Sequence, residues 1–320
     1  KDDNNDKKGY IQPLFNEEGE LLPGSSASLG YYYLTLGKRQ GIEKNKDSTL
    51  VLIQDDLEKH PDVMKAWGTI YPILFYEKKP SLGEKLLTER ITELESKKNL
   101  ADKDYQNLAT FYDLLGKETK RDSVKKIALE KFPKGSTAKQ GMISEFFKEK
   151  NTNNLKEILE DFKLSYGSGS RDTDMMLSIL ANKYSSSGNY KAFAEYADQI
   201  SDKSRKASLY NNVAWQLAEK GENLEFADKI SKESLDIMRS LENDPASKPN
   251  YFSKNQYRNE IKSSYTMYAD TYGLILFKEG KKEEALKYQE EALGENKMGS
   301  PEVNERYAQF LLANKKPKEA

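Results

Sequence analysis

Few residues of this chain could take part in catalysis. Its 320 residues include no cysteine and a single histidine, His60. Thiol chemistry, cysteine-ligated metals and sites built on paired histidines are therefore ruled out. The adjacent carboxylates Asp55–Asp56 and Glu283–Glu284 point to different faces of a helix, which makes them weak acid–base partners. We predict no catalytic residue, no metal ligand and no cofactor, and a protein that is not an enzyme.

His60 and the glycine-rich stretch 167–170 have structural interpretations. His60 precedes Pro61 at the expected end of a helix, where a cation is mildly favoured by the helix dipole. The sequence GSGS at 167–170 has no following lysine and no preceding strand, so it does not match a phosphate-binding loop. Neither feature indicates a reaction.

The charge pattern argues against a nucleic-acid partner. Lys and Arg together number 51, Asp and Glu 52, and the formal net charge is −1. A nucleic-acid-binding protein normally carries a basic stripe, because phosphate contacts dominate its affinity.

No apolar run approaches the roughly 18 residues of a membrane span. We expect neither a nucleic-acid partner nor a membrane-spanning segment.

The clearest pattern is a repeat near the C-terminus. The segment GKKEEA, which ends at Ala285, returns as NKKPKEA, which ends at Ala320, a shift of about 35 residues. Gly273, Gly280, Ala285 and Ala292 occupy positions where a tetratricopeptide repeat (TPR) has small residues, which let two antiparallel helices approach, and a glycine that ends the first helix. In pattern and period, this stretch resembles a TPR.

Further copies extend the pattern from Ser25 onward. They cover 101–135, a degenerate stretch at 136–162, 174–200 and 207–241, and Gly116, Gly188 and Gly221 end the first helix of three of them. Most copies are separated by about 33 to 38 residues, the range of TPR-like arrays. The sequence predicts an all-α, TPR-like α-α superhelix (solenoid) of about seven helical pairs, with a last pair that breaks off at Ala320.

Composition suggests where the array is divided. We expect residues 1–24 to be disordered or extended, 25–165 to form N-terminal repeats and 172–320 to form C-terminal repeats. The flexible stretch 165–171 is a possible hinge in one continuous solenoid. The connector 242–256 is unusually long and contains two prolines, which predicts an exposed loop or a lid.

The TPR frame also predicts a binding face. TPR-type arrays bind extended peptides on their concave side, so the resemblance implies a protein or peptide partner. Placed on residues 207–221 and on the two following copies, the frame assigns these residues to that face: Asn211, Trp215, Asp270, Leu274, Phe277, Glu305 and Gln309. For Trp215, packing against a neighbouring repeat is the alternative.

Several segments resemble a narrower family, the bacterial envelope thioredoxin-like proteins of the TlpA type. The matching stretches are 16–34, 210–231 and 268–293. In that family, a helical region lies between an N-terminal β-rich segment and a C-terminal thioredoxin domain. This chain has no Cys-x-x-Cys, so the resemblance implies the helical part without its redox domain, and it transfers no catalytic residue.

Together these patterns predict a non-enzymatic scaffold for protein–protein or peptide binding in the bacterial cell envelope. The start at Lys1 is expected of a chain whose signal peptide has been removed, in the periplasm or at the outer envelope; a cytoplasmic location stays open. One alternative is a spacer or regulatory module that serves a thioredoxin-like domain of the same full-length chain. Another is a glycan-binding envelope protein that uses Trp67 and Trp215.

Overall fold

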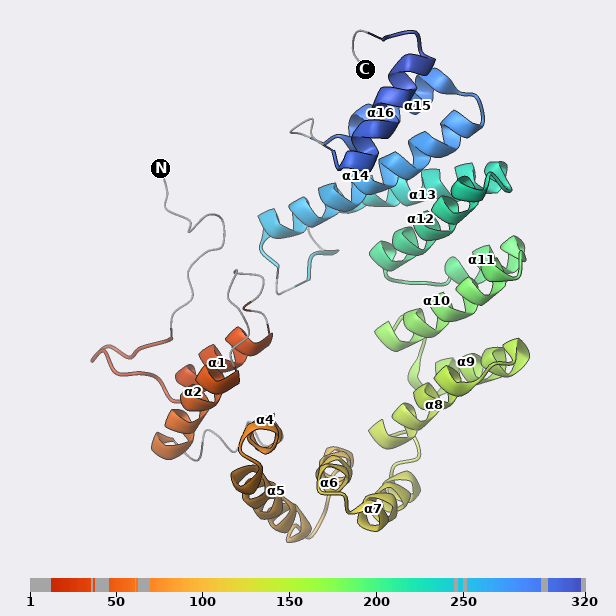
Figure 1. Cartoon of the computed structure of the whole chain (residues 1–320). Helices are drawn as coiled ribbons and strands as arrows, with labels where there is room; N and C mark the ends of the chain where they lie inside the picture. The colour runs from red at the N-terminus through yellow and green to blue at the C-terminus, as the bar shows by residue number, and fades with distance from the viewer. Residues whose placement is uncertain are drawn as a thin grey trace. The chain divides into compact units, whose positions relative to one another are not determined.

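The fold is all-α. The computed structural model describes residues 13–35, 37, 46–60, 62, 70–244, 247–249, 252–294 and 299–317. Across these ranges the only β feature is an isolated antiparallel bridge between Phe15 and Leu21. Every other regular element there is a helix (Figure 1). None of the helices in the described part is both long and apolar enough to cross a membrane.

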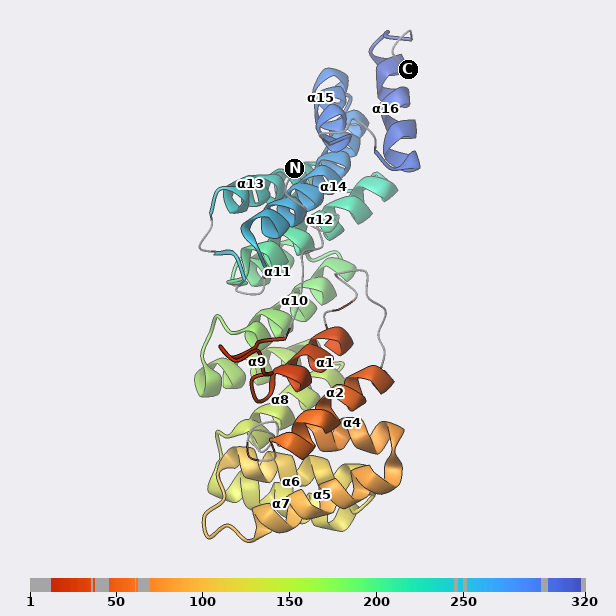
Figure 2. The same ribbon diagram turned by 90° about the vertical axis from the view of Figure 1, so that its left-hand side faces the viewer.

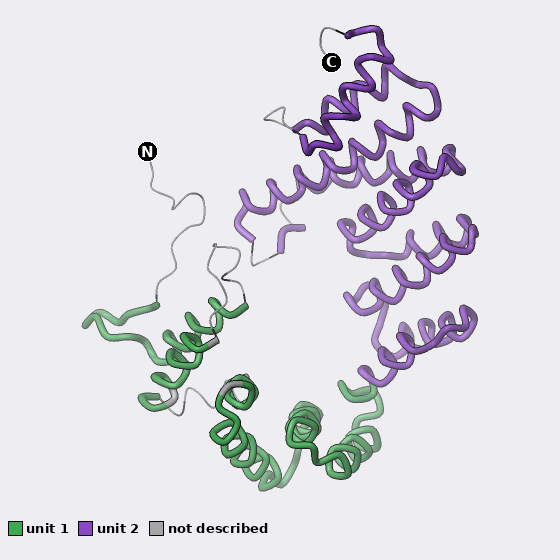
Figure 3. The backbone as a smooth tube through the Cα atoms, in the orientation of Figure 1, with its two compact units in different colours: residues 1–138 green, residues 139–320 purple. Residues whose placement is uncertain are grey.

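The chain divides into two compact units, Lys1–Ala138 and Lys139–Ala320, which are coloured separately in Figure 3. The stretch 165–171 lies inside the second unit, where it joins two helices. Bending at 165–171 stays a prediction. Trp67 and the segment 1–12 lie outside the described residues.

Unit 1 is built from pairs of consecutive helices. Its elements are α1 (Ser25–Thr35), α2 (Lys46–Lys59), α4 (Ile70–Lys78), α5 (Pro80–Glu95), α6 (Asp102–Leu114) and α7 (Glu118–Lys131). The pairs are α1 with α2, α4 with α5, and α6 with α7. One apolar cluster of this unit forms around Ile53 and Phe75, and another around Leu87 and Phe111.

Unit 2 continues the same arrangement. Apart from the start of α8 (Ser136–Lys148), it contains α9 (Thr152–Tyr166), α10 (Arg171–Ser186), α11 (Tyr190–Ala197), α12 (Lys203–Lys220), α13 (Leu224–Glu242), α14 (Lys254–Lys278), α15 (Lys282–Ala292) and α16 (Pro301–Ala313). Helices α10 to α15 pair in chain order, and α16 packs on α15. Figures 1 and 2 both place α14 beside α12 and α13. The predicted all-α fold, with consecutive helices packed in pairs, is confirmed within each unit in the described residues.

A glycine with positive φ follows the first helix of several pairs, as predicted. Gly116, Gly188, Gly221 and Gly280 have φ between 64° and 83°. Around Gly221, the N–H of Glu222 donates to the carbonyl of Leu217 at 3.0 Å, which closes the helix end. A Cβ at Gly221 would meet nothing within 4 Å, so the backbone conformation, and not space, favours glycine there. After α16, the same position is held by Lys315, with φ 60°.

The small residues at the helix crossings also lie where the pattern put them. Ala285 is fully buried, and Ala292 is 6% exposed. A Cβ at Gly273 would lie 3.0 Å from Gln289 Oε1 and 3.3 Å from the Ala285 carbonyl. Close approach of α14 to α15 therefore requires a minimal side chain at Gly273. Helix α14 begins at Lys254, where Ser253 and Gln256 form a capping box that satisfies the first backbone N–H groups.

Two aspartates connect successive pairs. Asp174, 2% exposed near the start of α10, accepts hydrogen bonds from the backbone N–H groups of Ser201 and Asp202, both at 2.9 Å, and from the Ser201 hydroxyl at 2.7 Å. These groups immediately precede α12. In unit 1, Asp102 of α6 accepts from the N–H of Ser136 at 2.7 Å. Each carboxylate thus satisfies backbone donors at the start of the next pair.

Candidate functional site

The residues predicted for the binding face lie on three alternate helices of unit 2. Helix α12 carries Asn211 and Trp215, α14 carries Asp270, Leu274 and Phe277, and α16 carries Glu305 and Gln309. Helices α12 and α14 pack against each other. We use the name inner face for the surface that these seven residues were predicted to form.

Arg306 of α16 joins two of the predicted residues. Its guanidinium forms an ion pair with Asp270 of α14 and lies over the Trp215 ring of α12, with its carbon 5.2 Å from the ring centroid. The side chains of Arg306 and Asp270 are only 16% and 12% exposed. Such a shielded ion pair is screened little by salt. The structure therefore brings Trp215 and Asp270 together through a residue that the sequence did not single out.

Gln289 of α15 completes this group. Its amide nitrogen donates to Asp270 Oδ1 at 2.6 Å and to the carbonyl of Val303 at 3.1 Å. Gln289 is fully buried, so its hydrogen bonds are made away from water. Gln289 lies one helical turn after Ala285, the residue at the crossing with α14. This spacing is the feature of the sequence from which its position facing α14 could have been predicted.

The remaining inner-face residues do not join this group. Phe277 stacks on Phe310 with ring centroids 4.3 Å apart, and Leu274 packs against the core around α10 and α12. Both side chains are half-buried and pack between helices, and their place on the binding face stays a prediction. Glu305 and Gln309 are exposed and are hydrogen-bonded to each other at 3.3 Å.

Asn211 is the polar residue of the inner face that lacks a partner. It is 5% exposed, and its carbonyl oxygen is buried without a hydrogen-bond partner in the described part of the structure. A buried acceptor left without a donor costs about 1–3 kcal/mol. Asn211 precedes Trp215 by one helical turn, so the two side chains share a face of α12.

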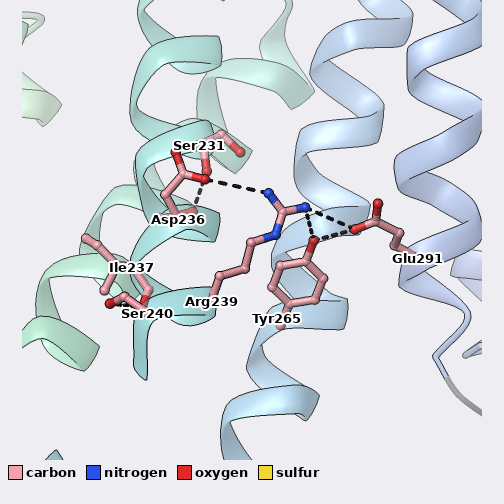
Figure 4. Close-up of polar contacts among 8 residues, drawn as sticks. Ser231, Asp236, Ile237, Arg239, Ser240, Tyr265 and Glu291 are labelled. Atoms are coloured by element: carbon pink, nitrogen blue, oxygen red, sulfur yellow. Dashed lines mark hydrogen bonds and ion pairs between the residues drawn. The ribbon is translucent and has the colours of Figure 1, made fainter. Parts of the chain in front are cut away.

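A second polar cluster, not predicted from the sequence, joins α13, α14 and α15 (Figure 4). The Tyr265 hydroxyl donates to Glu291 Oε2 of α15. Arg239 of α13 donates from Nη2 to the Tyr265 oxygen at 2.5 Å and to Glu291 Oε2 at 3.4 Å. Here the Arg239 and Glu291 side chains are 46% and 31% exposed. We call these residues the tyrosine cluster.

The tyrosine cluster borders an open cavity of about 660 Å³. Its lining includes Glu242, Lys262, Tyr265, Thr266, Glu290 and Glu291. Burial raises the pKa of the Tyr265 hydroxyl, and the hydrogen bond to Glu291 raises that pKa further. The hydroxyl therefore stays protonated at neutral pH and acts as a donor. The cluster can hold a ligand by hydrogen bonding, but Tyr265 is not a ready base.

Across the described residues, no group of three or more His, Asp or Glu side chains could hold a metal ion. His60 follows the last residue of α2, and its N–H donates to the Asp56 carbonyl at 2.7 Å. It is therefore part of the helix end, the position that the sequence suggested.

Comparisons with known proteins assign no family. No family model matches the chain, and no curated protein matches it. Among solved structures, the chain is similar to the crystal structure of BtubC (BKLC) from P. vanneervenii. The alignment covers 84% of this chain and 89% of the BtubC chain, with 12% identical residues and a TM-score of 0.29. That similarity is too weak to carry an argument about fold or function.

Proposed function

We propose that this chain is a non-enzymatic scaffold that binds a protein or peptide segment on the inner face of unit 2. The observation that carries the proposal is Asn211, whose side chain is only 5% exposed and whose amide oxygen has no partner among the described residues. A side-chain amide offers both a donor and an acceptor. A peptide group offers the complementary pair. Because the Asn211 oxygen has almost no accessible surface, an extended peptide would satisfy it once the side chain turns toward the inner face.

Trp215 and Arg306 support the same proposal. Trp215 is half-buried and lies one turn from Asn211, and Arg306 holds its ring from one side. A tryptophan fixed in this way loses little side-chain freedom on binding, as expected of an interface anchor. The repeated glycine turns and small crossing residues favour the resemblance to TPR arrays, whose members bind peptides. The absence of cysteine and the single histidine favour a role without catalysis.

The test is selection of peptides from a random display library on the full chain. Selected peptides are then titrated against Asn211→Ala, Trp215→Leu and the control Asn212→Ala. Asn212 is an exposed neighbour on a different face of α12. We expect Asn211→Ala and Trp215→Leu to weaken binding at least tenfold, about 1.4 kcal/mol, and Asn212→Ala to leave it unchanged.

Two results would overturn the proposal. One is a library that yields no binder, or binders that tolerate Asn211→Ala as well as Asn212→Ala. The other is measured turnover of a small substrate by the purified chain, which would remove the non-enzymatic assignment. Circular dichroism of each variant separates lost binding from lost folding.

A further inference from the structure

The guanidinium of Arg306 lies between side chains that two other helices supply. Trp215 of α12 gives an aromatic face, with the guanidinium carbon 5.2 Å from the ring centroid. Asp270 of α14 gives the counter-charge. Arg306 itself belongs to α16. Trp215 and Asp270 thus form a place for a guanidinium, and in this structure α16 fills that place.

The receiving carboxylate is held without the help of Arg306. The amide nitrogen of Gln289, on α15, donates to Asp270 Oδ1 at 2.6 Å, whereas Arg306 donates to the other oxygen, Oδ2. Asp270 is only 9% exposed, and a carboxylate so shielded from water is costly unless a cation lies beside it. The place therefore selects for a positive group.

The contact that Arg306 makes there can be exchanged. Arg306 reaches Asp270 through one nitrogen, Nη1, and the strongest arginine–carboxylate pairs use two. Its side chain is 16% exposed, so it lies within reach of solvent. Rotation of this side chain alone would empty the place, because the buried residues of α16 are Phe310 and Leu311, which would keep their packing.

The neighbouring charges also favour a cation. Glu305 directly precedes Arg306, and Glu302 lies one helical turn before it. Both glutamates are exposed, and each accepts a hydrogen bond from a neutral group, Glu302 from the Ser300 hydroxyl and Glu305 from the Gln309 amide. Together with Asp270, three carboxylates lie near one guanidinium, so a basic partner is attracted to this end of the inner face.

We propose that the bound peptide carries an arginine, and that its guanidinium exchanges with that of Arg306 between Trp215 and Asp270. This inference rests on the proposed function, because it names a residue of the peptide bound on the inner face. In the free chain Arg306 occupies the place and holds the Trp215 ring. In the complex the incoming arginine takes over both contacts, and the released Arg306 pairs with Glu302, four residues before it on α16.

Arginine fits this place better than lysine. Its planar, delocalised guanidinium stacks on an aromatic face while its nitrogens donate in the plane to a carboxylate. A lysine ammonium is a compact and strongly hydrated charge, which loses more on leaving water. Arg306 shows that a guanidinium can make both contacts at once.

The first experiment refills the place without any peptide. Thermal unfolding of Arg306→Ala is measured with methylguanidinium chloride or methylammonium chloride at about 50 mM, and each shift is compared with that of the wild-type chain. We expect methylguanidinium to raise the unfolding temperature of Arg306→Ala by about 2 °C relative to wild type, and methylammonium to raise it by less than half as much. Arg239→Ala is the control, because it empties a similar cluster whose arginine is 46% exposed.

The second experiment uses peptides selected on the full chain. An arginine-containing peptide should bind Arg306→Met about fivefold more tightly than wild type, since the competing guanidinium is gone. Exchange of the peptide's arginine for lysine should weaken binding about tenfold, the scale of one charge-assisted hydrogen bond. Arg306→Met keeps the aliphatic stem, so this measurement decides the question even where Arg306→Ala fails to fold.

Two results overturn the exchange and leave peptide binding intact. One is methylguanidinium that stabilises Arg306→Ala no more than Arg239→Ala. The other is a set of selected peptides that lack arginine, or that bind Arg306→Met no more tightly than wild type. A library without binders, together with stabilisation of Arg306→Ala by methylguanidinium, overturns the proposed function instead, because the place then accepts a guanidinium that no peptide delivers.

Discussion

Two clusters in unit 2 combine an arginine, a carboxylate and an aromatic ring, each from a different helix. In one, Arg306 joins Asp270 and Trp215; in the other, Arg239 joins Glu291 and Tyr265. The first arginine is 16% exposed and the second 46%. The same chemical groups therefore act in different surroundings. Burial determines whether such a cluster mainly holds helices together or stays available for a ligand.

Asp270→Ala is expected to cause the largest loss of stability. The substitution leaves the shielded Arg306 without its counter-ion and removes one of the two acceptors of the Gln289 amide. Loss of one partner of a buried pair costs about 3 kcal/mol. Urea unfolding followed by circular dichroism measures the change. Glu305→Ala, on the exposed side of α16, is the control and should stay within about 0.5 kcal/mol. Equal effects of the two substitutions would contradict the difference between the clusters.

Loss of the contact between Arg306 and Trp215 is expected to have the next largest effect on the free energy of unfolding. A double-mutant cycle with Arg306→Met and Trp215→Leu should give a coupling free energy of about 1 kcal/mol, because a guanidinium over a partly shielded indole is attracted to its ring face. The measurement is the unfolding free energy of both single variants and the double variant. Additive effects would show that Trp215 packs independently of Arg306.

Glu291→Gln tests the more exposed cluster. Its stability effect should be below about 1 kcal/mol, since half-exposed ion pairs contribute little. The substitution also removes a charge that raises the pKa of Tyr265, so that pKa should move down toward the ordinary value of 10.0. NMR of ¹³Cζ-labelled tyrosine follows the titration, with Tyr265→Phe identifying the signal. An unchanged titration would contradict the assigned hydrogen bond.

The pH dependence follows from the same shift. Because the pKa of Tyr265 is raised in the folded state, its contribution to stability is fully present below the unfolded value near 10.0 and is lost as the pH rises toward the folded value. Wild-type chain should therefore lose more stability above pH ~10 than Tyr265→Phe does. Chemical unfolding at several alkaline pH values measures the difference. Parallel stability curves for the two proteins would exclude this linkage.

The smallest expected effect is the change that salt makes to the stability differences caused by Glu291→Gln and Asp270→Ala. Raising the ionic strength to about 1 M shortens the screening length to about 3 Å. The stability difference caused by Glu291→Gln should shrink toward zero, whereas that caused by Asp270→Ala should persist. The comparison needs only the urea curves of both variants at two salt concentrations. Similar salt sensitivity would show that the two ion pairs are equally exposed to solvent.

Much of the fold could be predicted from local patterns. Gly116, Gly188, Gly221 and Gly280 adopt positive φ, and the small residues at Gly273 and Ala285 meet at a crossing. Such features depend on neighbours within one pair, which the sequence period places reliably. The resemblance to TPR and TlpA-type proteins stays a prediction.

The site was less predictable, because it depends on long side chains that cross between pairs. Arg306 is adjacent to the predicted Glu305, but its reach to Trp215 depends on the spacing of α12, α14 and α16, which no local pattern gives. The tyrosine cluster unites residues 239, 265 and 291, whose separation in sequence has no repeat signal. The stacking of Phe277 on Phe310 could not be predicted either, because the position of a ring on one helix does not reveal which side chain of the next helix it meets.

The aspartates at 102 and 174 have a thermodynamic consequence. Asp174 makes hydrogen bonds only if α10 and the start of α12 are both folded, so it adds a nearest-neighbour coupling term between adjacent repeats. In a linear array, such terms set how far local unfolding spreads before it stops. Strongly coupled repeats melt together, whereas weakly coupled repeats melt one at a time. Two short side chains thus help determine the cooperative length of each unit.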